Sequence, residues 1–201
     1  MIHQTSPFHC PKKWNGKFSK KVDLNVIGLT IFFGHGGNPY EVQAGFVGDR
    51  LRFVDTTRIF SRCVRWCCCV GEDGLPLAPD IQLIDSHFYP ATSDKPSMAF
   101  TFNVLDEFAI DALECKTAAM SFLSKLRRLT DRVFPLSTAN VYAAFMCCSR
   151  QWRNLMNLKQ AGIAHDKDRT RCPGDLGLFC MTCPQPGKNV SVDEVKTCSD
   201  P

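Results

Sequence analysis

The predicted fold of this chain depends on two β-rich stretches that stand close together, Leu51-Arg52-Phe53-Val54-Asp55 and Ile59-Phe60-Ser61-Arg62-Cys63-Val64-Arg65-Trp66-Cys67. Apolar and polar residues alternate through the first stretch and part of the second, which is the period of a strand with one buried face. Three residues, Thr56, Thr57 and Arg58, separate the two stretches. This spacing predicts a β-hairpin that leads into the run Cys67-Cys68-Cys69.

A further strand is predicted upstream, between Leu24 and Phe33, where β-favouring apolar residues are dense. It stops at Gly34-His35-Gly36-Gly37-Asn38-Pro39, a strong turn signal. Downstream of the hairpin, Gly71 to Pro79 is expected to be a loop. Asp80 to His87 is either a short helix or an extended segment.

Two helices are predicted in the second half. The first runs from about Asn103 to Arg132, with Thr101 or Asn103 as its cap, because apolar residues recur there at spacings of three and four. The second covers about Thr138 to Ala161, within a segment 138–163, and ends at Gly162, a typical C′ residue. We expect the two to pack as an antiparallel pair across the Phe134-Pro135 turn. The stripe of the first helix consists of Leu105, Phe108, Ala112, Cys115, Ala119, Phe122, Leu126, Leu129 and Val133.

The predicted fold class is therefore α+β: a small β-rich cysteine cluster over about residues 22–90, followed by a helical pair to about residue 165. The length of 201 residues and the apolar content of 44% allow one ordinary core, or two small ones held by metal.

No apolar run is long enough to span a membrane, and Met1 to Thr5 lack the basic flank and apolar region of a secretion signal. The expected compartment is intracellular, nuclear or cytoplasmic, and no membrane or secreted role is expected. The 12 cysteines include Cys67-Cys68-Cys69 and Cys147-Cys148. Adjacent cysteines do not easily bridge each other, so reduced thiols and metal ligands are favoured over a disulfide framework.

Charge is unevenly distributed along the chain. Residues 72–114 carry one Lys or Arg against nine Asp or Glu, whereas residues 115–171 carry eleven against three. The basic flank suits binding of DNA phosphates, but its charges also suit a helix C-terminus and pairing with the acidic block. The residues in question are Lys125, Arg127, Arg128, Arg132, Arg150 and Arg153.

The strongest metal-binding signal joins His35, in its glycine-rich loop, to Cys67 and Cys69 at the end of the hairpin. Alternate residues of a strand share a face, so Cys63, Cys67 and Cys69 can point to one side. Three thiolates and one imidazole form a tetrahedral zinc site. The alternative is that these cysteines are small hydrophobic core residues.

Two weaker metal signals lie near the ends of the chain. His3 and His9 flank Pro7-Phe8, and solvated terminal histidines are the alternative reading. Cys180 and Cys183 form a Cys-x-x-Cys pair, which favours half of a zinc site over a redox centre because Pro184 follows directly; plain structural cysteines are the alternative. No Ser/His/Asp order, phosphate loop or paired carboxylates stand out, so neither catalysis nor a small-molecule substrate is predicted.

Several strings, read in order, resemble the CxC2 cysteine-cluster domain associated with fungal KDZ (Kyakuja-Dileera-Zisupton) transposases. They are Trp14-Asn15-Gly16-Lys17-Phe18, Gly28-Leu29-Thr30-Ile31-Phe32-Phe33-Gly34-His35-Gly36-Gly37, Trp66-Cys67-Cys68-Cys69, Pro96-Ser97-Met98-Ala99-Phe100-Thr101-Phe102-Asn103-Val104-Leu105-Asp106, Ser124-Lys125-Leu126-Arg127-Arg128-Leu129-Thr130 and Ser149-Arg150-Gln151-Trp152-Arg153-Asn154-Leu155.

The resemblance implies a domain organisation. Residues 1–20, with the His-x5-His of His3 and His9, would be the remnant of an N-terminal His/Cys finger, and residues 22–131 the CxC2-like domain. Residues 166–201 would be a linker and the start of a transposase core. The family also has a cysteine where Tyr40 stands, so one ligand of the His35 site is expected to be missing.

The expected function is that of a non-catalytic, zinc-binding accessory region of a transposase, whose partners are DNA, the transposase core or another protein. The carboxylates that cut DNA in relatives are expected to lie in a core that this chain lacks. The alternatives are a zinc-dependent protein-interaction module and an inactive, decayed transposon fragment.

Overall fold

The computed structural model describes residues 7–38, 49–70, 74–163, 187 and 191. The chain divides into two compact units, Met1–Trp152 and Arg153–Pro201. The first unit contains the sheets and nearly all the helices. What is described of the second unit is mainly the end of the last helix. The observed mixture of helices and strands confirms the predicted α+β class.

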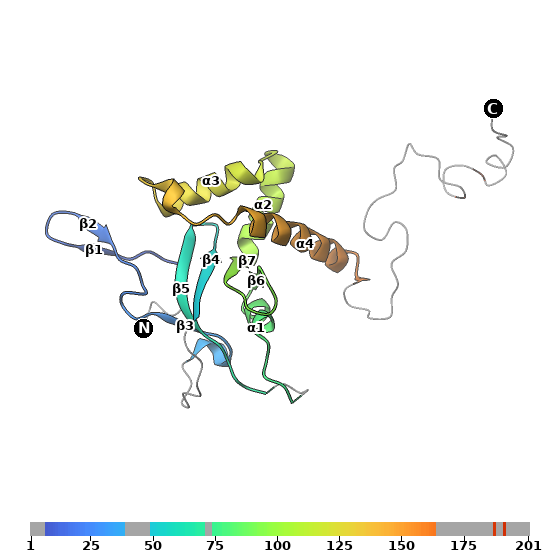
Figure 1. Cartoon of the computed structure of the whole chain (residues 1–201). Helices are drawn as coiled ribbons and strands as arrows, with labels where there is room; N and C mark the ends of the chain where they lie inside the picture. Colours follow the sequence, from blue (N-terminus) through green and yellow to red (C-terminus); the bar gives the residue numbers. More distant parts are fainter. Residues whose placement is uncertain (1–6, 39–48, 71–73, 164–186, 188–190, 192–201) are drawn as a thin grey trace. The chain divides into compact units, whose positions relative to one another are not determined.

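A five-stranded mixed sheet forms the centre of the first unit, in the order β3-β5-β4-β7-β6 (Figure 1). The predicted hairpin is confirmed, since β4 and β5 pair antiparallel from Val54↔Ile59 to Asp49↔Val64. β3 pairs parallel to β5, β7 pairs parallel to β4, and β6 pairs antiparallel to β7. The strands are β3 (Thr30–Phe32), β4 (Asp49–Val54), β5 (Ile59–Arg65), β6 (Phe88–Pro90) and β7 (Met98–Thr101).

The upstream strand is shorter than predicted. β3 covers only Thr30–Phe32, and the residues from Leu24 to Gly28 form a turn. The Asp23 carboxylate starts this turn by accepting a hydrogen bond from the backbone N–H of Asn25 at 3.1 Å. Gly28 then takes a φ of 80°, a left-handed conformation that ends any extended run.

The core of the sheet consists of buried aromatic and aliphatic side chains on one face of β4 and β5. Phe33 and Trp66, which directly follow β3 and β5, stack with ring centroids 4.9 Å apart. Most of the segment 80–87 is helical: α1 (Pro79–Asp85) begins with a proline and contributes the buried Leu83. The cluster contains Phe33, Leu51, Phe53, Phe60, Val64, Trp66, Leu83 and Ala99.

The predicted long helix is wrong, because the structure breaks it into α2 (Phe102–Glu114) and α3 (Ala119–Thr130). Lys116 stands at the break with a φ of 52°, and the N–H groups of Cys115 and Thr117 both donate to the Asp111 carbonyl. The apolar stripe continues through the break, which is why sequence periodicity did not reveal it. Thr101 caps α2, since its hydroxyl accepts a hydrogen bond from the Val104 N–H at 3.2 Å.

The second predicted helix is present as α4 (Tyr142–Gln160), and Gly162 follows it with a φ of 74°. A single turn of 3-10 helix, η2 (Pro135–Ser137), precedes it. The predicted helical pair is therefore three helices. An aromatic cluster joins all three helices, because the ring of Phe122 lies 5.2 Å from that of Phe108 and 5.7 Å from that of Phe145 between centroids.

A separate two-stranded ribbon, not predicted from the sequence, consists of β1 (Lys12–Trp14) and β2 (Ser19–Lys21). It pairs antiparallel and belongs to no larger sheet. Figure 1 shows it beside the end of α3, away from the five-stranded sheet. Every residue of both strands is exposed.

Candidate metal centre

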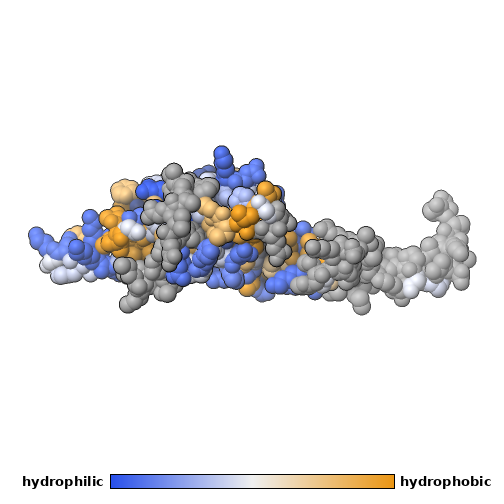
Figure 2. All heavy atoms as spheres, turned by 90° about the horizontal axis from the view of Figure 1, so that it is seen from below, coloured by the Kyte–Doolittle hydropathy of each residue, from blue (hydrophilic) through white to orange (hydrophobic). Residues whose placement is uncertain are grey.

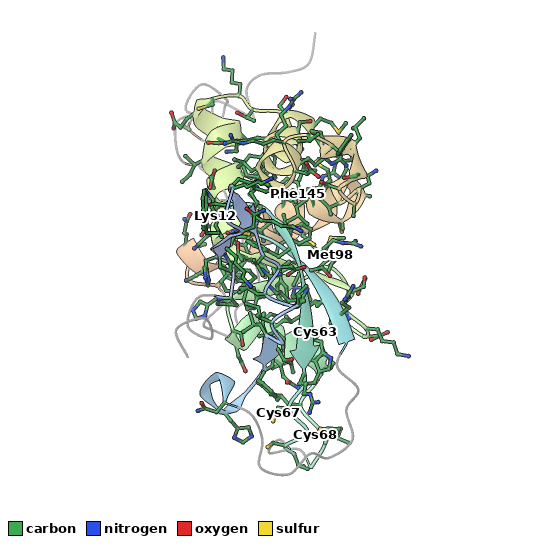
Figure 3. The ribbon with its side chains drawn as sticks, turned by 90° about the vertical axis from the view of Figure 1, so that its left-hand side faces the viewer. Lys12, Cys63, Cys67, Cys68, Met98 and Phe145 are labelled. Atoms are coloured by element: carbon green, nitrogen blue, oxygen red, sulfur yellow. The ribbon has the colours of Figure 1, made fainter. Side chains whose placement is uncertain are left out.

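The site is positioned by the parallel pairing of β3 and β5. Phe32 lies opposite Arg65, so both strands end at the same edge of the sheet. The residues that follow them, Gly34-His35 after β3 and Cys67-Cys68-Cys69 after β5, leave that edge together. In Figure 3, Cys67 and Cys68 lie beyond the end of the strand that carries Cys63.

His35, Cys67 and Cys69 come together at this edge. The Nε2 atom of His35 lies 3.0 Å from the Cys69 Sγ atom and 3.4 Å from the Cys67 Sγ atom. All three donor atoms lie within 4.8 Å of one another. Cys67 is buried, whereas His35 and Cys69 are exposed, so the group sits at the surface with one wall in the core.

Cys63 does not belong to this group. It lies inside β5, where it pairs with Thr30 on one side and Arg50 on the other. The expectation that Cys63 shares a strand face with Cys67 and Cys69 does not match the structure, because β5 ends at Arg65 and the strand alternation stops before those two residues.

The donor set fits zinc. A tetrahedral ion with its usual bond lengths holds two thiolate sulfurs about 3.8 Å apart, and a sulfur and an imidazole nitrogen about 3.6 Å apart. In the structure, the His35 Nε2 atom lies 3.4 Å and 3.0 Å from the two sulfurs, slightly less than the ideal separation. All three donor atoms lie within 4.8 Å of one another, so they match three corners of such a tetrahedron. Two soft thiolates with one imidazole favour zinc over calcium or magnesium, which prefer oxygen ligands.

The loop that presents His35 has an unusual backbone. Gly34, His35, Gly36 and Gly37 all have positive φ, between 46° and 81°. Glycine adopts this conformation without cost, but histidine has a Cβ and rarely does. Residues held in such regions cluster at functional sites, and here the strained residue is the one that carries the imidazole.

Cys67 is held from behind by Gln82 of α1, a residue that sequence reasoning missed. The Gln82 Oε1 atom accepts from the Cys67 N–H at 2.8 Å, and its Nε2 atom donates to the Cys67 carbonyl at 3.0 Å. Gln82 is only 2% exposed. The one available signal was a lone amide in an otherwise apolar stretch of α1, and nothing in the sequence linked it to Cys67.

The Cys69 N–H donates to the Cys67 sulfur at 3.3 Å, so the tripeptide curls around one thiol. Hydrogen bonding with Cys67 is the main cause that raises the pKa of the Cys69 thiol above its ordinary value. Two neighbouring sulfurs therefore resist carrying negative charge together. A bound divalent cation would remove that repulsion and release the protons.

Residues 24–134, more than half of the chain, match the family model described as the CxC2-like cysteine cluster associated with KDZ transposases. The chain belongs to this family. The matched CxC2 region contains His35, Cys67, Cys69 and Gln82, and it excludes the β1–β2 ribbon and α4. No curated protein and no solved structure matches the chain.

Within the described part of the chain, none of the other residues predicted as metal ligands belongs to the group formed by His35, Cys67 and Cys69. His9 is half-buried in the segment before β1 and is not a member of the group. His3, Tyr40, Cys180 and Cys183 lie outside the described residues. A fourth ligand for the CxC2 site thus has no candidate within the described part of the chain.

Two of the basic residues predicted to contact DNA have partners within the fold. Lys125 forms ion pairs with Glu107 at 2.9 Å and with Asp111 at 3.7 Å. The hydrogen bond with Glu107 raises its pKa. Arg127 donates to the Asn140 side chain at 3.0 Å. Arg128, Arg132 and Arg150 are exposed, and Arg153 is exposed in the second unit.

None of the helices in the described residues has the length and apolar character needed to cross a membrane.

Proposed function

We propose that this chain serves as a non-catalytic, zinc-binding accessory region of a KDZ-type transposase. Two observations support the proposal: the match of residues 24–134 to the CxC2 family, and the convergence of His35, Cys67 and Cys69. The matched region is a cysteine cluster and not a catalytic domain, which favours an accessory role.

Zinc at this position would cross-link the ends of β3 and β5. His35 would supply its Nε2 atom, and Cys67 and Cys69 would supply thiolates. The donors are protein side chains at the edge of a sheet, and a closed site of this kind stabilises a fold without reacting. The strain at His35 fits this role, because metal binding offsets the cost of a left-handed histidine.

Metal analysis of the purified chain tests the proposal. We expect about one zinc ion per chain in the unchanged protein and loss of that zinc when Cys67 and Cys69 are both changed to serine. His35→Asn should also lose it, since asparagine tolerates the left-handed backbone but lacks the imidazole. Cys63→Ser is the matched control and should retain zinc. Full zinc in the double variant contradicts the assignment.

Within the transposase, we assign this region to binding transposon DNA in the nucleus. The exposed arginines Arg128, Arg132 and Arg150 support this assignment, since guanidinium groups contact phosphates without reading sequence. Lys125 and Arg127 contribute less, because both are engaged within the fold. Changing the three exposed arginines to glutamine should weaken binding to unrelated duplexes equally and flatten its salt dependence.

A zinc-dependent protein-interaction module is the second candidate, and one observation favours it. Ile110 and Leu113 of α2 are 61% and 79% exposed, although they are large and apolar. Exposed apolar residues on one helix are typical of a protein-binding face. Absence of any salt-dependent DNA binding, together with stable self-association in sedimentation, would favour this candidate over the first.

A further inference from the structure

The β1–β2 ribbon carries an unusual concentration of positive charge. Between residues 12 and 21 there are five lysines, and there is no carboxylate from residue 10 to residue 22. The ribbon lysines Lys12, Lys13, Lys17, Lys20 and Lys21 are all exposed. None of them forms an ion pair within the part of the chain that the structure describes.

The pairing of the strands brings these charges together. Lys12 lies opposite Lys21, and Lys13 lies opposite Lys20. Like charges directly across an antiparallel pair are destabilising, and two consecutive pairs compound the cost. Because successive side chains point to opposite faces, one lysine pair projects from each face of the ribbon. An arrangement that costs stability on both faces indicates an anionic partner on both faces.

The tip of the ribbon is preorganised. The Asn15 side chain accepts hydrogen bonds from the N–H groups of Lys17 at 3.0 Å and Phe18 at 2.8 Å. Gly16 supplies the positive φ of 96° that the turn requires. Trp14 and Phe18 flank the turn and are 63% and 57% exposed.

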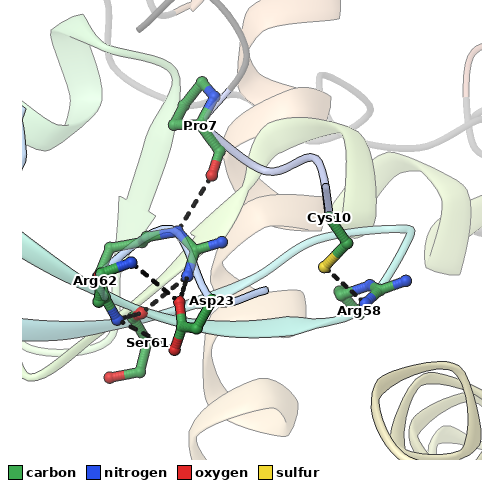
Figure 4. A network of polar contacts seen from close by, with 7 residues as sticks. Pro7, Cys10, Asp23, Arg58, Ser61 and Arg62 are labelled. Carbon is green, nitrogen blue, oxygen red and sulfur yellow. Dashed lines mark hydrogen bonds and ion pairs between the residues drawn. The ribbon is translucent and has the colours of Figure 1, made fainter. Parts of the chain in front are cut away.

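The base of the ribbon is tied to the five-stranded sheet on both sides (Figure 4). Arg62 of β5 is buried and reaches both ends, donating to the Pro7 carbonyl at 3.1 Å and pairing with Asp23 at 2.9 Å. Arg58 donates to the Cys10 sulfur. The ribbon therefore does not need to be ordered by its partner, which removes a large part of the cost of binding.

The two basic faces select among anionic partners. A lipid surface or a flat acidic protein surface neutralises one face of a ribbon and leaves the other uncompensated. The major groove of B-form DNA admits a two-stranded ribbon and places a phosphate backbone on each side of it. The major groove of duplex RNA is too narrow for this. Figure 2 shows hydrophilic surface at the end of the first unit where the ribbon lies.

We propose that the β1–β2 ribbon is a DNA-binding arm that enters the major groove, with its two lysine pairs on the phosphate backbones that line the groove. The arm is distinct from the arginines of α3 and α4, and it does not depend on the zinc centre. Its contacts are mainly to phosphate, so binding is expected to be strong at low salt and only weakly selective for sequence.

The test measures binding of the full chain to a fluorescent duplex over a range of salt concentrations. The ribbon variant changes Lys12, Lys13 and Lys20 to glutamine; Lys21 stays, because its charge helps lower the pKa of Asp131. The control variant changes Lys95, Lys116 and Lys159 to glutamine, so its net charge equals that of the ribbon variant. The ribbon variant should bind roughly a hundredfold more weakly near physiological salt, with a salt slope smaller by about three. The control should change little.

Tryptophan fluorescence provides a second readout that locates the contact. Trp66 and Trp152 are buried, so quenching by acrylamide reports mainly on Trp14. Duplex DNA should protect Trp14, and Trp14→Phe should abolish the protection. Equal DNA binding by the ribbon and control variants overturns the proposal, as does tighter binding to duplex RNA or to vesicles with anionic lipid.

Zinc content separates this proposal from the preceding one. The ribbon variant should retain its zinc and lose no thermal stability, since the facing lysine pairs are themselves destabilising, and this shows that it is folded. A chain that binds DNA through the ribbon but carries no zinc would support the arm and contradict the zinc centre. A chain that carries zinc but whose DNA binding does not depend on the ribbon would support the zinc centre and contradict the arm.

Discussion

Gln82 satisfies both backbone polar groups of Cys67. Its amide accepts from the Cys67 N–H at 2.8 Å and donates to the Cys67 carbonyl at 3.0 Å, and a third hydrogen bond to the Leu77 carbonyl at 2.7 Å holds the amide itself. One buried side chain from α1 thereby places a candidate metal ligand that belongs to a loop. The contact joins residues that are 15 positions apart.

Gln82→Leu should weaken zinc binding and the fold together. It removes both hydrogen bonds that Gln82 makes to the backbone of the buried Cys67, at a cost of about 1–3 kcal/mol. Loss of such a supporting contact typically lowers metal affinity about 10–100-fold. Chelator competition and urea unfolding measure the two effects. Gln82→Glu keeps the accepting oxygen, so its zinc affinity and stability should lie between those of Gln82→Leu and the unchanged protein. Zinc affinity unchanged in both variants would show that Gln82 supports only the core.

Gly37→Ala should disturb the metal centre more than its cost in stability suggests. Gly37 and Gly28 have nearly equal φ values, 81° and 80°, so alanine at either position costs about 1–2 kcal/mol in strain. Only Gly37 belongs to the loop that presents His35. Gly28→Ala is therefore the matched control: both variants should lose similar stability in urea, but only Gly37→Ala should lose zinc affinity. Equal zinc affinity in the two variants would show that the conformation of this loop does not affect the metal site.

Lys116→Gly should stabilise the protein. Lys116 has a φ of 52° at the break between α2 and α3, where glycine removes a strain of about 1–2 kcal/mol. Glycine also gains freedom in the unfolded chain, so the net gain is about 1 kcal/mol or less. For a protein of this size, that raises the midpoint of thermal unfolding by about 2–4 °C. Lys95→Gly is the control, because Lys95 does not have a positive φ, and it should not raise the midpoint of thermal unfolding. A lower midpoint in both variants would indicate that Lys116 is not strained.

Asp131 should make stability depend on pH on the acid side. Its carboxylate accepts hydrogen bonds from the N–H groups of Phe134 and Val133, and these bonds lower its pKa. A lowered pKa adds stability above the unfolded value, and this stability is lost as pH falls through the folded value. Asp131→Asn should thus lower the urea midpoint at pH 7, and the difference should shrink in acid. A difference independent of pH would exclude the carboxylate charge as its source.

Local pattern was a reliable guide to several elements. The alternation on either side of Thr56-Thr57-Arg58 predicted the β4–β5 hairpin, and the spacing after Thr138 predicted α4. The Thr101 cap was one of two predicted alternatives. These features depend on residues within a few positions of each other, so the sequence carries the whole signal.

The break at Lys116 shows where such reasoning fails. The apolar stripe has the same period in one long helix and in two shorter ones that fold back, since both bury Phe108 and Phe122. In the structure, Phe145 of α4 packs against both rings, a contact between residues far apart in the sequence that the local pattern does not contain. The ribbon was missed for a related reason: its strands are three residues each and bury nothing, so no hydrophobic alternation marks them.

The sequence by itself determined which chemistry is available: two cysteines and a histidine in a glycine-rich context, at the ends of β-rich segments. Only the tertiary structure decided which of them meet. The parallel pairing of β3 with β5 joins Phe32 to Arg65 across 33 positions, and it selects Cys67 and Cys69 while leaving Cys63 inside the strand. The physical reason is that strand pairing and its register are set by burial of the whole sheet, a long-range balance that no short stretch of residues contains.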